Sequence, residues 1–255
     1  MLRSIRAFEG YQVHAIDGDI GSVCDFYFDD EHWAIRYLIV DTGAFFAGRR
    51  VLVSPISFGH ADWSTRRFSV ALTREMVKNS PRIDLDRPVS REYEREFFRY
   101  YGWSYYWGFD KGGIWGGETY PYILGTRTWS DRRHPEKDGG DPHLRSVREI
   151  VGYRVEGTDG AIGHVDDFIV DDETWAIRYL VIDTRNWWLD RKVLVAPHWA
   201  ERISWTENSV YLNLPRQKIK HSPEWHADAT VNREYEARLY DYYGRPAYWS
   251  GPDKR

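Results

Sequence analysis

The chain has 255 residues, of which 42% are hydrophobic and 29% are charged, so it is long enough and apolar enough to bury a core. Its formal net charge is -4, and basic residues are interspersed with acidic ones, which argues against a general basic surface for nucleic acid. The single cysteine, Cys24, excludes an intramolecular disulfide and a metal cluster built on cysteines.

Neither a membrane-spanning segment nor a secretion signal is expected. No apolar run reaches the roughly 18 residues that cross a bilayer, and the N-terminus lacks the apolar region of a signal peptide. We therefore expect a cytoplasmic protein, with peripheral membrane association left open.

Most of the sequence occurs twice. Residues 28–42 return with few changes as residues 170–184, and the same offset holds without a gap from Leu2 against Leu144 onwards. A repeat at one fixed spacing indicates a tandem duplication.

The duplication predicts three segments. A first repeat with a C-terminal helix covers 2–109, and a second repeat of the same design covers 144–251. The intervening 110–143 has no counterpart; it is rich in glycine and aromatic residues at first and charged later, as expected of a linker.

Short apolar runs separated by turn residues predict strands in each repeat. In the first repeat they cover 12–15, 20–28, 33–40 and 50–53, with weaker signals at 56–61 and 68–72. The strand 33–40 is apolar on both faces, so we expect both faces to be covered. Five or six short strands with tight turns predict a small closed barrel, which the second repeat forms again over 153–214.

A helix is predicted after each barrel. Ser90 and Asn232 are good N-cap residues, and Gly102 and Gly244 end the two segments. Side chains at helical spacing form one aromatic stripe per helix, which we expect to dock onto a barrel: Tyr93, Phe97, Tyr100 and Tyr101, then Tyr235, Leu239, Tyr242 and Tyr243.

Three motifs recur at equal spacing in both repeats. In the first they are Asp17-Gly18-x-Ile20-Gly21, the strand Trp33-x-Ile35-Arg36-Tyr37-Leu38, and Val51-Leu52-Val53-x-Pro55. Together they resemble the PRC-barrel, a β-barrel module known from the cytoplasmic domain of the photosynthetic reaction centre H subunit and from a bacterial ribosome maturation factor. The chain looks most similar to stand-alone tandem PRC-barrel proteins of bacteria.

The resemblance implies a fold and a style of function. The fold is mainly β, with two tandem small PRC-type β-barrels, each followed by a short α-helix. Such barrels act as binding and assembly modules, so the resemblance implies that the protein is not an enzyme.

The residues themselves predict no catalytic group, no cofactor and no metal. None of the nine histidines recurs as histidine in the other repeat, and none pairs at the spacing of zinc ligands. The triplet Asp29-Asp30-Glu31 is contiguous, whereas a calcium loop spaces its ligands, so it predicts a solvated hairpin turn.

Duplicated residues of the central strand are predicted to be structural. Arg36 lies among apolar neighbours and is expected to pair with Asp25 or Asp41. Its counterpart Arg178 is expected to pair with Asp167 or Asp183. The full set of predicted structural residues is Trp33, Arg36, Tyr37, Asp41, Trp175, Arg178, Tyr179 and Asp183.

The best candidates for binding follow the central strand. Phe45 and Phe46 in the first repeat align with Trp187 and Trp188 in the second. Neighbouring residues of an extended segment point to opposite faces, so one of each pair should face away from its barrel. These rings either contact another chain or seal the two barrels against each other, and stacking on RNA is a weaker alternative.

The sequence therefore predicts a non-catalytic scaffold or adaptor that mediates protein–protein assembly. Its protein partner is unidentified, a homo-oligomer is left open, and nucleic acid is not expected. The alternatives are a ribosome- or RNA-associated maturation factor and a metal-dependent hydrolase.

Overall fold

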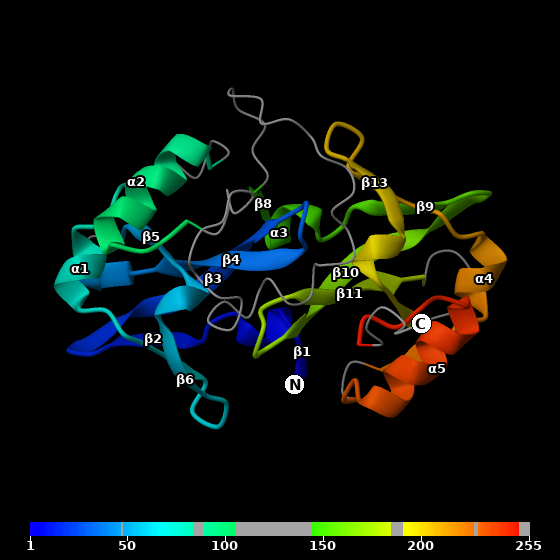
Figure 1. The fold of residues 1–255 in the computed structure, drawn as a ribbon, viewed down its shortest axis with the longest axis horizontal. Coiled ribbons are helices and arrows are strands. Elements are labelled where there is room, and N and C mark those ends of the chain that lie inside the picture. Colours follow the sequence, from blue (N-terminus) through cyan, green and yellow to red (C-terminus); the bar gives the residue numbers. More distant parts are fainter. Residues whose placement is uncertain (47, 84–88, 106–143, 185–190, 227–228, 250–255) are drawn as a thin grey trace, which may run out of the picture. The chain divides into compact units, whose positions relative to one another are not determined.

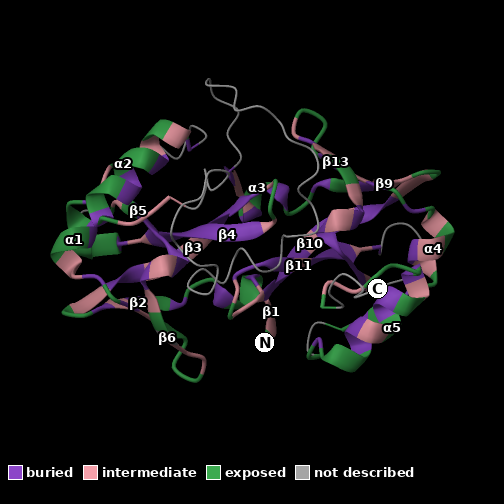
Figure 2. Ribbon diagram, in the orientation of Figure 1, coloured by how far each residue is buried: buried purple, intermediate pink, exposed green. Residues whose placement is uncertain are grey.

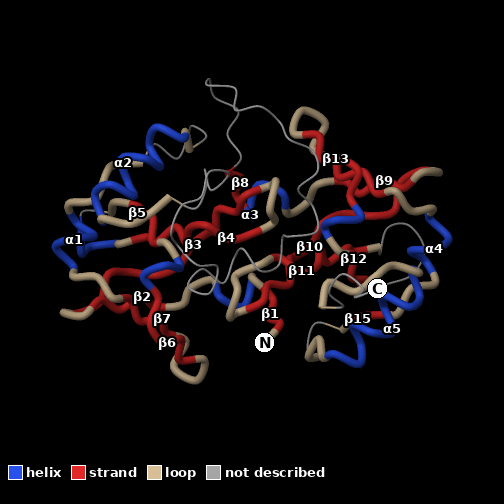
Figure 3. The backbone as a smooth tube through the Cα atoms, viewed as in Figure 1, coloured by secondary structure: helices blue, strands red, loops and turns tan. Residues whose placement is uncertain are grey.

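The structure is a computed structural model that describes residues 1–46, 48–83, 89–105, 144–184, 191–226 and 229–249 (Figure 1). The chain forms two compact units, one of Phe8–Val147 and one of Met1–Ala7 with Arg148–Arg255. Each unit is built on its own sheet with a few short helices (Figure 3). The prediction of a mainly β protein is confirmed.

The unit Phe8–Val147 holds a seven-stranded sheet in the order β5-β4-β3-β2-β7-β6, in which β8 also pairs with β3. The pair β2 and β7 is parallel. The ends of this order, β5 and β6, are linked in the chain through the 3₁₀ helix η3 (Pro55–Ser57). The strands are β2 (Gln12–Ala15), β3 (Gly18–Asp29), β4 (Ala34–Asp41), β5 (Arg50–Val53), β6 (Phe58–Asp62), β7 (Arg67–Val70) and β8 (Leu144–Ser146).

The other unit holds an eight-stranded sheet in the order β13-β14-β9-β10-β11-β12-β15, in which β1 also pairs with β10. The pair β9 and β14 repeats the parallel pairing of the first unit. The strands are β1 (Leu2–Ser4), β9 (Arg154–Gly157), β10 (Gly160–Asp171), β11 (Ile177–Asp183), β12 (Lys192–Val195), β13 (Ala200–Ser204), β14 (Ser209–Leu212) and β15 (Glu224–Trp225).

The helices also occur in pairs. The longest are α2 (Arg91–Tyr101) and α5 (Arg233–Tyr243), which follow the shorter α1 (Arg74–Lys78) and α4 (Arg216–Lys220). The remaining short helices are η1 (Arg6–Phe8), η2 (Gly43–Phe46), α3 (Val147–Ile150) and η4 (Pro197–Trp199).

The central strand β4 is covered on both faces, as predicted. Every residue from Ala34 to Val40 is buried (Figure 2). The strand begins one residue later than expected, because Trp33 adopts a left-handed conformation with φ of 52° and donates its N–H to the Asp29 carbonyl at 2.7 Å. Trp175 repeats this conformation with φ of 57°, so the tight hairpin belongs to both repeats.

The helix predicted after the first barrel is confirmed. The Ser90 hydroxyl accepts a hydrogen bond from the N–H of Tyr93 at 3.2 Å, and Gly102 ends α2 with φ of 70°. The buried face differs from the predicted stripe by one position, since Phe98 is buried and Tyr100 is exposed. Phe97 and Phe98 pack edge-on against Tyr37, so α2 docks on its own sheet.

Each unit completes its sheet with a strand that the sequence assigns to the other repeat. β1 opens the first repeat but pairs antiparallel with β10, and β8 opens the second repeat but pairs antiparallel with β3. The two repeats have therefore exchanged their first strands. The predicted segments 2–109 and 144–251 follow from the similarity between the repeats, and that similarity does not show which repeat's sheet each first strand joins.

Candidate functional site

The acidic triplet at the end of β3 contains a buried anchor. The Asp29 side chain is 0% exposed, and its Oδ1 accepts hydrogen bonds from the N–H groups of Glu31 and His32 at 3.0 and 3.1 Å. Its Oδ2 accepts from Arg36 Nη2 at 2.9 Å. The prediction of a solvated turn is thus wrong for Asp29, because the hairpin places this carboxylate beside a buried guanidinium.

The predicted partners of the two strand arginines are also wrong. Arg36 pairs with Asp29 instead of Asp25 or Asp41, and Arg178 pairs with Asp171, at 3.2 Å, instead of Asp167 or Asp183. The arginine and its acid are seven residues apart in the hairpin, on facing strands.

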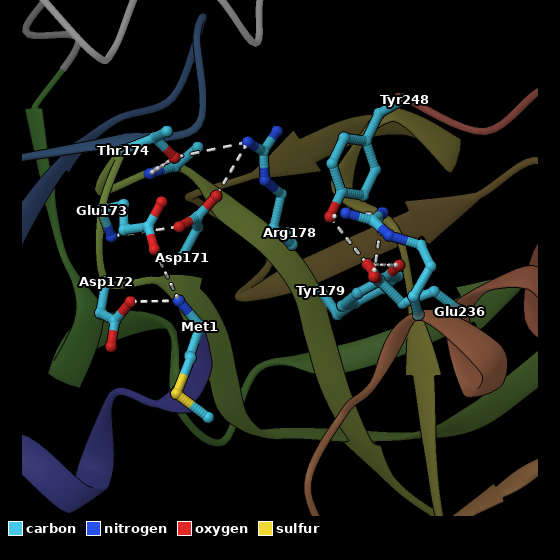
Figure 4. Close-up of polar contacts among 11 residues, drawn as sticks. Met1, Asp171, Asp172, Glu173, Thr174, Arg178, Tyr179, Glu236 and Tyr248 are labelled. Carbon is cyan, nitrogen blue, oxygen red and sulfur yellow. Dashed lines mark hydrogen bonds and ion pairs between the residues drawn. The ribbon is translucent and has the colours of Figure 1, made fainter. Parts of the chain in front are cut away.

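The charge of Asp29 is stabilised by this pairing. Burial alone would raise the pKa of Asp29, but the opposing charges and hydrogen bonds of Arg36 and His32 outweigh it and hold that pKa below its usual range. The pKa of Asp171 is also lowered, against burial, by the N–H of Glu173 and by Arg178. Figure 4 shows Arg178 reaching both Asp171 and Thr174, the counterpart of His32.

Asp29, Glu31 and His32 offer ligand atoms within 4.8 Å of one another, the one such group of potential metal ligands among the described residues. Both oxygens of Asp29 already accept hydrogen bonds from the backbone and from Arg36. An ion would have to displace those donors, so the geometry describes a closed hydrogen-bonded turn.

The exchanged strand β1 is held by two acidic side chains, one on β10 and one directly after it. The Ser4 hydroxyl donates to Asp167 Oδ2, and Arg3 Nε donates to Asp172 Oδ2 at 2.6 Å. Burial raises the pKa of Asp167, an effect that the hydrogen bond from Ser4 opposes. Asp167 therefore serves the incoming strand.

The exchanged strand β8 is held in the same way by β3. The Ser146 hydroxyl donates to Asp25 Oδ2 at 2.6 Å, and Arg145 Nε donates to Asp30 Oδ2 at 3.1 Å. Asp25 and Asp30 stand where Asp167 and Asp172 stand in the other repeat. The duplicated acids thus form two equivalent recognition sites for an extended strand.

A buried glutamate ties each long helix to its sheet. Glu94 is 1% exposed and accepts hydrogen bonds from Tyr37 Oη and Arg91 Nη1, both at 3.0 Å. Sequence reasoning missed this residue, although Glu94 lies three positions before Phe97 and so belongs to the buried face of α2. Tyr37, which is predicted to be structural, donates the hydrogen bond that helps to stabilise the buried carboxylate of Glu94.

The second repeat extends the same network. Glu236 accepts from Tyr179 Oη at 2.7 Å and from Tyr248 Oη at 2.8 Å, and Arg233 lies 3.1 Å from its other oxygen (Figure 4). Burial raises the pKa of Tyr179 well above its usual range, and the neighbouring Glu236 charge adds to this effect. Tyr179 therefore stays protonated and donates.

His198 distinguishes the second unit, because Ile56 stands at the equivalent position. Its ring stacks on Tyr240 and meets the edge of Trp199. Burial, together with the positive charges of Arg245 and Arg178, lowers the pKa of His198 from 6.5 to about 4.

We expect this histidine to make the unit Met1–Ala7 with Arg148–Arg255 sensitive to mild acid. The unfolded chain takes up a proton near pH 6.5 and the folded unit only near pH 4, so stability is complete above pH 6.5 and falls as the pH decreases towards 4. The loss at pH 4 should be about 3 kcal/mol at most. Urea unfolding at pH 7 and pH 4.5 measures it. His198→Ile, borrowed from the first repeat, should remove most of this dependence, and an unchanged dependence in the variant would refute the assignment.

The two residues predicted for binding in the first repeat lie on η2. Phe45 is 52% exposed, Phe46 is half-buried, and the Arg74 guanidinium lies 5.4 Å from the centre of the Phe45 ring. Trp187 and Trp188 lie outside the described residues. The prediction that one ring of the pair faces outward thus agrees with Phe45 in the first repeat.

The remaining predicted structural residues line the two hairpins and strand ends. Trp33 is half-buried and its ring stacks on that of Phe28, with the ring centres 5.3 Å apart, whereas Trp175 is buried. Asp41 is half-buried and accepts the N–H of Gly43 at 2.9 Å at the start of η2. Asp183 is half-buried at the end of β11.

Exposed apolar side chains gather around α1 in the unit Phe8–Val147. Arg74 and Met76 on α1 contact, respectively, the ring of Phe45 and the hydroxyl of Tyr100, which donates to the Met76 carbonyl at 2.9 Å. The turn that carries Ile16 is fixed to the start of this helix, where Asp17 accepts the N–H of Arg74 at 2.7 Å. We call this surface the α1 patch; its apolar members are Ile16, Phe45, Met76 and Tyr100, between 36% and 72% exposed.

Comparison with known proteins finds a partial likeness. Residues 142–216 match the family model of the PRC-barrel domain, and the matched segment includes the exchanged strand β8. An uncharacterized protein of Deinococcus radiodurans is 36% identical over 84 residues, which are 32% of this chain and 30% of that protein. Among the described residues, no helix has the length and hydropathy to cross a membrane.

Proposed function

We propose that the protein is a non-catalytic scaffold or adaptor of the cytoplasm that assembles proteins, and that both of its repeats are PRC-type barrels. The family match of residues 142–216 supports this role, because PRC-barrel domains serve as interaction modules. The first repeat shares with the second the motifs, the strand order and an acid–arginine pair in the hairpin.

The observation that carries the proposal is the α1 patch. Its counterparts in the second repeat include the exposed Thr158 and the half-buried Lys218, where the first repeat has Ile16 and Met76. The framework beneath is the same, since the Tyr242 hydroxyl donates to the Lys218 carbonyl at 2.8 Å as Tyr100 does to Met76. The fold therefore does not require apolar residues at positions 16 and 76, and exposed apolar clusters are typical of surfaces that bind other proteins.

The test replaces two patch residues by their counterparts in the second repeat and shortens the exposed ring of Phe45 to alanine. We expect Ile16→Thr combined with Met76→Lys and Phe45→Ala to keep the native circular dichroism spectrum and unfolding midpoint. The variant should lose at least about tenfold of the partner captured by the tagged wild-type chain from soluble and membrane fractions of its host.

Val151→Thr is the matched control, because Val151 is 37% exposed in the other unit and lies outside the patch. Equal capture by wild type and patch variant would reject the patch as the binding surface. Recovery of RNA that is released by moderate salt would instead favour the RNA-associated alternative.

A further inference from the structure

Each unit has a slot that recognises one short sequence. The slot of the unit Phe8–Val147 is made by Asp25 on β3 and by Asp30 just after it, and that of the other unit by Asp167 on β10 and by Asp172 just after it. Both slots hold the same tripeptide, Leu-Arg-Ser, at residues 2–4 and 144–146.

The register of the strand is the same in the two slots. Arg3 lies opposite Val170, and Arg145 lies opposite Phe28, which is the equivalent position. Antiparallel backbone pairing gives affinity, and the two side-chain contacts give specificity, as in other sheets that gain a strand. The carboxylate of Asp172 is only 6% exposed and pairs with both Arg3 and the Met1 amino group, so the slot favours an incoming strand that brings positive charge to it.

The contacts in the slot do not depend on which molecule supplies the strand. β1 belongs to the sheet of the unit Met1–Ala7 with Arg148–Arg255. The chain that follows β1 enters the other unit at Phe8. Another copy of this chain carries the same Leu-Arg-Ser at residues 2–4, so it offers a strand of the sequence that the slot already binds.

We propose that the β10 slot also accepts β1 from a second copy of this chain, which gives a reciprocal strand-exchanged dimer. This inference deepens the assembly role proposed above and rests on it. In a dilute solution the high effective concentration of the chain's own β1 favours the monomer, and the dimer gains as the protein concentration rises.

A pair of charge reversals in the full chain tests the proposal. Arg3→Asp faces the native Asp172, and Asp172→Arg faces the native Arg3, so each variant alone has two like charges in its slot. In a mixture, the strand of each variant matches the slot of the other. We expect each single variant to be destabilised in the unit that contains β10, and the double variant Arg3→Asp with Asp172→Arg to regain stability as a monomer.

The decisive sample is an equimolar mixture of the two single variants, unfolded and refolded together. We expect light scattering to find a species of twice the 30.2 kDa chain mass, and differential tags to show that it holds one chain of each variant. The β3 slot is native in all samples and serves as the internal control.

Rescue in the double variant without a mixed dimer would overturn the proposal, since the slot would then accept its own strand alone. Lack of rescue in the double variant would show that the Arg3–Asp172 pair does not select the strand, and would also overturn it. Neither result changes the capture of other proteins by the α1 patch, so failure of this inference and failure of the proposed function are distinguishable.

Discussion

Replacement of Asp29 by alanine is expected to lower the free energy of unfolding of the unit Phe8–Val147 by about 3–5 kcal/mol, because it removes one member of a buried ion pair. Arg36 is 8% exposed and donates to Asp29 through both Nε and Nη2. The change also removes the acceptor of the N–H groups of Glu31 and His32 in the turn. Urea unfolding followed by circular dichroism measures the loss.

The second repeat provides the matched comparison. Asp171 is 17% exposed and Arg178 is 11% exposed, so water can partly replace the lost partner in Asp171→Ala. We expect this variant to cost clearly less than Asp29→Ala. The double variant Asp29→Leu with Arg36→Met removes both charges and should recover much of the loss. If Asp29→Ala and Asp171→Ala lower the free energy of unfolding equally, the burial of the ion pair does not determine how much it contributes to stability.

Gly21→Ala should be more disruptive still, with a cost of about 4 kcal/mol or more to the unit Phe8–Val147. A Cβ atom at Gly21 would lie 2.1 Å from the Asp41 carbonyl oxygen and 2.8 Å from the Thr42 Cα. These are backbone atoms, so the clash cannot be relieved by rotation of a side chain, and β3 would have to separate from β4. We expect a large fall in the unfolding midpoint or failure to accumulate folded protein.

Gly59→Ala is the control for the glycine substitution itself. Gly59 lies in β6 of the same sheet, and a Cβ atom there would meet nothing closer than the Ser69 carbonyl oxygen at 3.7 Å. We expect a change of about 0.5 kcal/mol or less at this exposed site. Gly163→Ala should reproduce the Gly21 effect in the other unit, since its Cβ would also lie 2.1 Å from a carbonyl oxygen, that of Asp183. A mild effect at Gly21 and Gly163 would mean that the two strands can move apart cheaply.

Local patterns predicted the elements well where neighbours in the chain decide the conformation. The strands Gln12–Ala15 and Arg50–Val53 and the helix from Ser90 to Gly102 follow from apolar spacing and from capping residues. The weak signal at 56–61 became a 3₁₀ turn followed by β6, because Pro55 starts η3. Pro55 fixes its own φ and lacks an N–H group, so it favours a helical first turn over a strand.

Contacts between distant residues decided the chemistry of the acids. The sequence shows that Asp29, Asp25 and Glu94 are duplicated, but each of them has several arginines, serines and tyrosines as potential partners. The hairpin brings Asp29 to Arg36, β8 brings Ser146 to Asp25, and α2 brings Glu94 to Tyr37. Asp29 and Glu94, whose charges alone would suggest exposure to solvent, are therefore buried next to donors that only the folded chain brings to them.

The sequence by itself determined the duplication, the mainly β character of both repeats and the capped helices that follow them, because these depend on local patterns and on internal comparison. Only the tertiary structure decided which strand fills which slot. Both repeats carry the same Leu-Arg-Ser strand and the same two acids to receive it, so either arrangement satisfies the same hydrogen bonds and ion pairs. In the structure β1 pairs with β10 and β8 pairs with β3, and these pairings join residues far apart in the sequence, which local patterns do not encode.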